Sequence, residues 1–127
     1  MSAAVPQADR RSRVRNACDG LAVTLRVRGQ WFNRPAVALD FSREGIALLW
    51  PNSLAKHRTV FLSLRQGNLA VENLVGVVHN CTAHERGYRL GIRFRTESEL
   101  QLDPAVVVEH LHDLYDQMLG PALPCAE

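Results

Sequence analysis

The chain has 127 residues, 46% of them hydrophobic and 22% charged, a composition typical of one soluble globular domain. Its apolar runs are much shorter than the roughly 20 residues that a membrane-spanning helix needs. The first ten residues lack the apolar core of a secretory signal, so we expect a cytoplasmic protein without membrane insertion. Three widely spaced cysteines, Cys18, Cys81 and Cys125, argue against a disulfide scaffold.

The net charge of +2 hides an uneven distribution. Residues 1–60 carry ten Lys or Arg against four Asp or Glu, whereas the remainder carries five against nine. Fourteen of the fifteen basic residues are Arg, whose planar fork pairs with phosphate oxygens or with the O6/N7 edge of guanine. A genomic bias toward Arg would explain the total, but it would not explain the clustering within residues 10–15.

The first segments follow a clear order. Residues 1–9 are small and polar and predict a flexible N-terminus. A basic segment, residues 10–16, comes next. The alternating residues Leu21, Val23, Leu25 and Val27 predict a first strand. Gly29 and Gln30 then form a tight turn into a second strand that ends near Leu39, and Pro35 indicates an edge position or a bulge within it.

Four further strands are predicted by alternation. In the fifth, residues 69–81, we expect Val71, Val75 and Val77 on one face, and we expect residues 82–87 to connect it to the last strand. In the last strand, Arg89, Gly91, Arg93 and Arg95 should face away from the apolar row. The apolar rows of the third, fourth and last strands are Ile46, Leu48 and Trp50; Val60, Leu62 and Leu64; and Tyr88, Leu90, Ile92 and Phe94.

The chain ends with a helical pattern. Asp103 can cap a helix whose first residue is Pro104, and Gly120 ends it. Its apolar residues recur at helical spacing: Val107, Leu111, Leu114 or Tyr115, and Met118. Such a helix covers the barrel, or alternatively binds a partner. We expect a mainly β fold, an antiparallel six-stranded barrel over about residues 20–96 with a C-terminal α-helix over about residues 103–119, followed by a tail, residues 120–127.

Two short segments carry the candidate site. The arm, residues 10–16, offers guanidinium groups from Arg10, Arg11 and Arg15 that can fold over a bulky anion resting on the barrel wall. A solvated basic tail is the plain alternative. In the second segment, Asp40 can accept paired hydrogen bonds from guanine N1–H and its N2 amino group. There, Ser42 can donate to a phosphate oxygen.

Gly45 completes this second segment, because a glycine permits a positive φ or a close approach that a side chain would forbid. Taken alone, such a segment is an ordinary turn, since Asp, Ser and Gly are common turn residues.

Both segments together resemble the PilZ domain family. Arg11 and Arg15 match its Arg-x-x-x-Arg arm, and Asp40, Ser42 and Gly45 match its Asp/Asn-x-Ser-x-x-Gly turn. The resemblance covers roughly residues 9–119, so a single PilZ domain over residues 10–119 is expected. It implies a barrel that binds the bacterial second messenger cyclic di-GMP, with Arg11 and Arg15 on guanine edges and phosphates.

The resemblance also assigns the remaining roles. By the family pattern, Asp40 reads a guanine, Ser42 a phosphate, and Gly45 leaves backbone room. Arg10, immediately before the arm motif, often accompanies a stacked ligand dimer in this family, which favours two ligands per chain. Asn16 departs from the pattern, because an apolar residue is common there. The resemblance further implies a signalling switch, in which ligand binding orders the arm and changes the surface offered to an unidentified effector protein.

Other functions fit less well. No nucleophile is evident beside a His in the arrangement of a triad, so we expect no enzyme and no cofactor. The group His79, Cys81 and His84 lacks a second ligand pair and predicts ordinary strand residues, not a metal site. A PilZ-like adaptor that binds no nucleotide is the main alternative. A barrel for single-stranded nucleic acid is not expected, although Trp31 and Phe32 could serve as stacking platforms.

Overall fold

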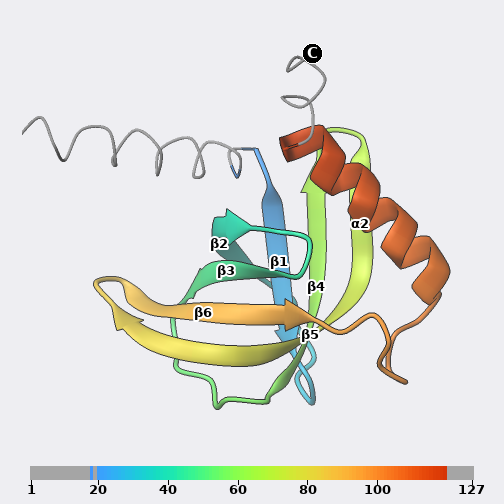
Figure 1. The fold of residues 1–127 in the computed structure, drawn as a ribbon. Helices are drawn as coiled ribbons and strands as arrows, with labels where there is room; N and C mark the ends of the chain where they lie inside the picture. Colours follow the sequence, from blue (N-terminus) through green and yellow to red (C-terminus); the bar gives the residue numbers. More distant parts are fainter. Residues whose placement is uncertain (1–17, 19, 120–127) are drawn as a thin grey trace, which may run out of the picture.

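The computed structural model describes residue 18 and residues 20–119, which form six strands followed by one helix (Figure 1). The strands are β1 (Ala22–Val27), β2 (Arg34–Phe41), β3 (Gly45–Trp50), β4 (Thr59–Gln66), β5 (Leu69–His84) and β6 (Gly87–Phe94), and the helix is α2 (Pro104–Leu119). The predicted flexible N-terminus (1–9), the arm (10–16) and the tail (120–127) lie outside the described residues.

The six strands form a closed barrel. Neighbouring strands are antiparallel throughout, and the order β1-β2-β3-β6-β5-β4 closes because β1 pairs with β2 on one side and with β4 on the other. Closure removes the exposed edges that an open sheet would present to other chains. The predicted fold class, an antiparallel six-stranded barrel with a C-terminal helix, is confirmed.

The barrel core consists of the apolar rows that alternation predicts. In the predicted rows of β1, β3, β4 and β6, every side chain is at most 8% exposed except Tyr88, which is partly buried. Burial of each aliphatic or Phe side chain stabilises the fold by about 1.5–3 kcal/mol. The core residues of four strands are Val23, Leu25 and Val27 of β1, Ile46, Leu48 and Trp50 of β3, Val60, Leu62 and Leu64 of β4, and Leu90, Ile92 and Phe94 of β6.

Pro35 lies in the part of β2 that pairs with β1 but not with β3. It pairs with Thr24 of β1, whereas the pairing of β2 with β3 starts at Val37. A residue without an N–H is tolerated at such a position. The bulge of β2 lies further along, between Ala38 and Asp40.

The prediction that Val71, Val75 and Val77 share one face of the fifth strand is wrong. β5 contains a bulge at Asn73, whose φ is 56°, so two residues of β5 lie opposite one residue of β4. An extra residue reverses the alternation of faces. After the bulge, Leu74 continues the inward row that Val71 begins.

The predicted connection over residues 82–87 is mostly strand. β5 continues to His84 and β6 starts at Gly87, so that only Glu85 and Arg86 form the turn of the hairpin. The polar residues near the end of β5 are exposed, and an antiparallel ladder accepts polar side chains on a face that meets water. Polarity alone therefore did not identify a loop.

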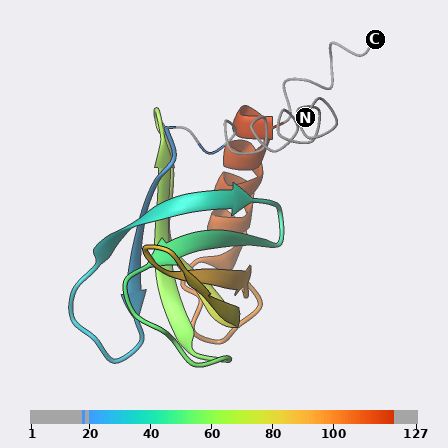
Figure 2. The same ribbon diagram turned by 90° about the vertical axis from the view of Figure 1, so that its left-hand side faces the viewer.

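Helix α2 packs beside β5 (Figures 1 and 2). Val107, Leu111 and Leu114 are buried against the barrel, at the helical spacing predicted from the sequence. The Asp103 carbonyl oxygen accepts the first helical hydrogen bond, from the N–H of Val107 (3.0 Å). Within the described residues, no helix is long and apolar enough to span a bilayer.

Gln101 fastens the segment before α2 to the bulge of β5. Its side-chain Oε1 accepts a hydrogen bond from the N–H of Val75 (2.8 Å), and its Nε2 donates to the carbonyl oxygen of Asn73 (2.8 Å). Gln101 is 6% exposed, so these bonds satisfy polar groups that water does not reach. The segment that precedes α2 thus holds the bulge of β5 in place.

Candidate functional site

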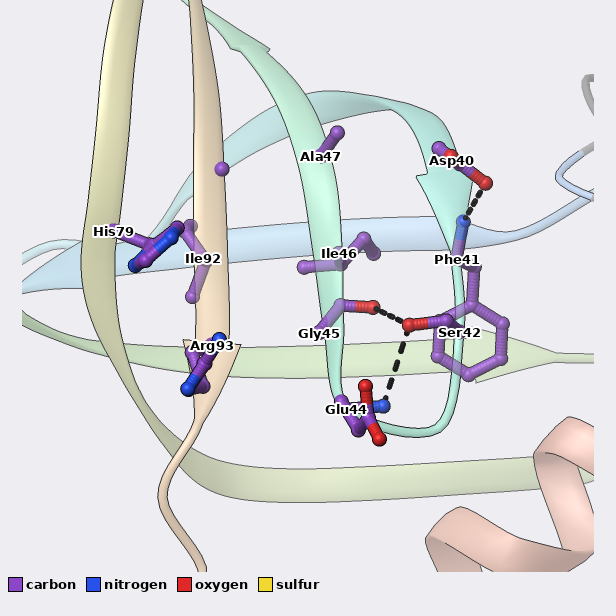
Figure 3. A pocket seen from close by; sticks show the side chains of 11 residues that line it. Asp40, Phe41, Ser42, Glu44, Gly45, Ile46, Ala47, His79, Ile92 and Arg93 are labelled. Atoms are coloured by element: carbon purple, nitrogen blue, oxygen red, sulfur yellow. Dashed lines mark hydrogen bonds between the residues drawn. The ribbon is translucent and has the colours of Figure 1, made fainter.

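The β2–β3 turn, residues 42–44, borders a hollow on the outer wall of the barrel (Figure 3). Asp40 and Ser42 line this hollow from the turn side, together with Gly45 at the start of β3. Three residues that the sequence assigns to one site therefore do lie together.

Phe41 and Arg43 anchor the turn to α2. The ring of Phe41 is buried and lies 5.9 Å from the ring of Tyr115 and 6.3 Å from the ring of Phe94, measured between centroids. The guanidinium of Arg43 lies 4.9 Å from the centre of the Tyr115 ring. These contacts hold the turn on the helix and leave the polar side chains of its neighbours facing outward.

Asp40 presents an exposed carboxylate at the edge of the hollow. Its Oδ1 accepts a hydrogen bond from the N–H of Phe41 (2.8 Å), which fixes the orientation of the group. A carboxylate oxygen has two acceptor positions, and Oδ2 has no hydrogen-bond partner among the described residues. The carboxylate therefore keeps free acceptor capacity on both oxygens.

Ser42 makes only long hydrogen bonds within the turn. Its hydroxyl donates to the carbonyl oxygen of Gly45 (3.4 Å) and accepts from the N–H of Glu44 (3.3 Å), whereas its own N–H donates to the Gly45 carbonyl at 3.0 Å. O–H···O bonds are usually near 2.7–2.8 Å and N–H···O bonds near 2.9–3.0 Å, so both side-chain bonds are weak. The hydroxyl can exchange them for a stronger acceptor.

Gly45 is required by strand packing. It pairs with Arg93 of β6, and a Cβ built on it would overlap the carbonyl oxygen of Ile92. A backbone atom cannot move aside as a side chain can. The absent side chain thus allows β3 to approach β6 and brings Arg93 beside the turn.

Register across four strands places two small residues in one row of the hollow. Asp40 of β2 pairs with Ala47 of β3, Ala47 with Gly91 of β6, and Gly91 with Asn80 of β5. Residues opposite one another across a sheet share a face, at a spacing of about 4.8 Å between strands. Ala47 and Gly91, which we call the shelf, thus lie between Asp40 on one side and Asn80 on the other.

Two residues of the hollow, His79 and Arg93, were not singled out as site residues from the sequence (Figure 3). His79 is the extra residue of a second β5 bulge, between Val78 and Asn80, which directs it toward the hollow. Arg93 belongs to the outward row that alternation predicts. Its place beside the turn follows from its pairing with Gly45, which a single strand's pattern cannot reveal.

The hollow is too small to enclose a dinucleotide. Its volume is about 210 Å³, less than the roughly 300–1,000 Å³ of pockets that enclose whole small ligands. It can receive one base or one phosphate, so a larger ligand needs a second contact. The predicted second contact, formed by Arg10, Arg11 and Arg15, lies outside the described residues.

The described histidines and cysteines do not gather into a cluster. Among residues 18 and 20–119, no group of three or more His, Cys, Asp or Glu is close enough to hold a metal ion. Cys81 is partly buried and packs against the core, and Cys18 is buried. Both cysteines thus pack with the core of the fold.

Fold and site together define a small closed β-barrel with a hollow of polar and apolar residues on its wall, next to a helix that covers one side. The chain belongs to the PilZ domain family, whose model matches residues 9–111. That match includes both the arm and the β2–β3 turn.

A solved structure agrees with this fold. The chain is similar to the PilZ domain of YcgR from Escherichia coli with c-di-GMP, with a TM-score of 0.58 and 13% identity over 85% of this chain and 88% of that one. It is also similar to the Borreliella burgdorferi PlzA protein in complex with c-di-GMP, with a TM-score of 0.49 and 13% identity over 78% of this chain and 36% of that one. Comparison with curated proteins finds no match.

Proposed function

We propose that the chain is a receptor for cyclic di-GMP. The observation that carries the proposal is the exposed Asp40 carboxylate, fixed by the N–H of Phe41 at the edge of the shelf. Membership of the PilZ family and the match to the YcgR domain with c-di-GMP add support. A receptor of this kind binds its ligand without chemical change, in the cytoplasm.

The shelf suits a guanine base. Ala47 and Gly91 line the hollow without large side chains of their own. A flat ring can rest on them once the side chain of Asn80, which lies against Gly91, moves aside. At one edge, Asp40 accepts hydrogen bonds from the N1–H and the N2 amino group of guanine. Two residues further along β6 from Gly91, the guanidinium of Arg93 donates to O6 and N7 or to a phosphate, a charge-assisted bond of about twice the usual strength.

Ser42 and Gly45 support the same ligand. The hydroxyl of Ser42 leaves its long bonds to Glu44 and Gly45 and donates to a phosphate oxygen. Gly45 supports ligand binding through its neighbours, because its lack of a side chain lets Arg93 approach the turn.

The arm supplies the second contact that the small hollow requires. Arg11 and Arg15 bind guanine edges and phosphates of the part of the ligand that extends beyond the shelf. Arg10 favours a stacked pair of ligands, hence two molecules per chain. The family match begins at residue 9 and thus includes these residues.

The output is a change of surface. Binding orders the arm against the barrel wall, and an unidentified effector protein responds to the new surface. The extra contacts that the arm makes in the bound state provide the free energy for this shift.

Calorimetric titration tests the proposal. The wild-type protein should bind cyclic di-GMP saturably and should bind cyclic di-AMP at least tenfold more weakly, since adenine lacks the N1–H and N2 donors for Asp40. Asp40→Ala should lower the affinity by at least about 1.5 kcal/mol, the low end for bonds to charged groups. Asp116→Ala, which removes an exposed carboxylate from α2, is the matched control and should leave the affinity unchanged.

Absence of binding by the folded wild-type protein, with ligand in excess, would contradict the proposal. It would favour the alternative, a PilZ-like adaptor that contacts proteins without a nucleotide. If Asp40→Ala and Asp116→Ala change the affinity equally, the protein is still a cyclic di-GMP receptor, but Asp40 is not part of its binding site.

A further inference from the structure

The β1–β2 loop, residues 28–33, exposes two consecutive aromatic side chains. Trp31 is 89% exposed and Phe32 is 77% exposed, whereas the other tryptophan, Trp50, is 4% exposed in the core. Large apolar side chains normally gain about 1.5–3 kcal/mol from burial, so two adjacent ones in water point to a surface that another molecule covers.

Hydrogen bonds hold the base of this loop. The N–H of Gln30 donates to the carbonyl oxygen of Val27 (2.9 Å), and Nη1 of Arg26 donates to the carbonyl oxygen of Gln30 (3.2 Å). From the neighbouring β3–β4 loop, Nη2 of Arg58 donates to the carbonyl oxygen of Arg28 (3.2 Å). The two aromatic residues therefore extend from a supported base.

Cations lie in and beside the loop, and neither this loop nor the β3–β4 loop, residues 51–58, contains an Asp or Glu. Residues 20–39 and 45–71 together contain six Lys or Arg and no Asp or Glu. Arg28, Arg34, Lys56 and Arg58 are all exposed. In both views of the fold, the β1–β2 and β3–β4 loops lie at the same end of the barrel, away from the C-terminal end of α2 (Figures 1 and 2).

We propose that the β1–β2 loop docks on the surface of a bilayer that contains anionic lipids. Trp31 and Phe32 would enter the region of the headgroups, where aromatic residues are enriched, and the cations at the base of the loop would lie near the phosphates. The contact is peripheral and involves no spanning segment. It is independent of the cyclic di-GMP site, which lies on the barrel wall.

Charge and position favour a bilayer over the other anionic partners. Single-stranded nucleic acid needs rings set along a groove in which cations follow the backbone. Here the two rings are neighbours in one connecting loop. Arg26, which is close to the loop, is already engaged within the protein. Its guanidinium lies 4.5 Å from the centre of the Phe61 ring and donates a hydrogen bond to the carbonyl oxygen of Gln30.

Tryptophan fluorescence gives a direct test. Large vesicles of phosphatidylcholine and phosphatidylglycerol in equal parts should shift the emission of the wild-type protein to shorter wavelength and protect it from iodide. Vesicles of phosphatidylcholine alone should do neither. Because Trp50 is buried, the shift should come from Trp31. The Trp31→Phe variant should therefore show no shift, although it should still sediment with the anionic vesicles.

Sedimentation of variants with vesicles measures separately what the aromatic residues and the cations contribute to the contact. Trp31→Ala should weaken vesicle binding about tenfold, which corresponds to about 1.4 kcal/mol. Arg28→Gln should weaken it about fivefold, since each cation near an anionic surface contributes about 1 kcal/mol. Arg86→Gln, in the β5–β6 turn, is the matched control and should leave it unchanged. Affinity for cyclic di-GMP should be the same in all four proteins.

Two results would overturn the inference. One is that the wild-type protein does not sediment with the anionic vesicles at low salt, where electrostatic attraction is strongest. The other is that a labelled single-stranded oligonucleotide binds and Trp31→Ala weakens that binding more than it weakens binding to vesicles. The second result would assign the loop to nucleic acid instead.

Discussion

Two connections of the same barrel use their residues in opposite ways. The β2–β3 turn has three residues, is tied by backbone and side-chain hydrogen bonds, and is anchored on α2 through Phe41 and Arg43. The β1–β2 loop has six residues and turns its two largest side chains outward, with Trp31 89% exposed. Closure of the barrel pairs the strands with one another, so the connections are not needed to complete the sheet. We propose that one connection receives a small ligand and the other contacts a larger surface.

The largest expected effect concerns the fit of the turn against the barrel. Gly45→Ala should lower the free energy of unfolding by about 3 kcal/mol, the upper part of the range for overpacking, because the new Cβ would overlap the backbone of Ile92. Gly29→Ala in the β1–β2 loop has no atom within 4 Å of the new Cβ, although its φ is 95°. It should lose only about 1–2 kcal/mol. Urea denaturation measures both, and equal losses would contradict the contrast.

Next in size is the contribution of the arm to ligand binding. Arg15→Ala should weaken binding of cyclic di-GMP by at least about 1.5 kcal/mol, more than tenfold, because it removes charge-assisted bonds to the ligand. Calorimetry measures the change, with Arg86→Ala as the control at an exposed Arg of the β5–β6 turn. If both variants bind like the wild type, Arg15 does not contact the ligand.

The hydroxyl of the turn should matter less. Ser42→Ala should weaken ligand binding by about 1 kcal/mol, the usual net contribution of one hydrogen bond. Stability should change little, since the bonds that the hydroxyl makes in the free protein are 3.3 and 3.4 Å long. Ser98→Ala, in the segment before α2, is a control for hydroxyl loss. A larger fall in stability than in affinity would assign Ser42 to the turn alone.

The smallest effect belongs to the exposed loop. Trp31→Ala should change the free energy of unfolding by less than about 0.5 kcal/mol, as surface substitutions usually do. Its affinity for cyclic di-GMP should equal that of the wild type. Thermal unfolding and calorimetry measure the two quantities, and a fall in either would mean that the loop is part of the core or of the site.

The sequence predicted most of the barrel because inward and outward residues alternate in β1, β3, β4 and β6. It was wrong for β5, where the bulge at Asn73 adds one residue and reverses the faces. A bulge has no period of its own, so the alternation of Val71, Val75 and Val77 could not reveal it. The end of β5 was missed because exposed strand residues have the polar composition of a loop.

The candidate site was predicted as far as it lies in one segment. Asp40, Ser42 and Gly45 follow one another closely, and the turn chemistry of these residue types is local. Arg93 and His79 come from strands far away in the sequence, and only the pairing of β3 with β6 and of β6 with β5 brings them to the turn. The role of Gly45 likewise depends on the position of a neighbouring strand.

An NMR titration of the isotope-labelled protein with cyclic di-GMP tests the central claim most directly, because it reports on the turn, the arm and the loop together. We expect the largest shifts at the backbone amides of Phe41, Ser42 and Gly91 and within residues 10–16, with no shift at Trp31. Shifts that leave out residues 40–45, or no shift with ligand in excess, would contradict the account.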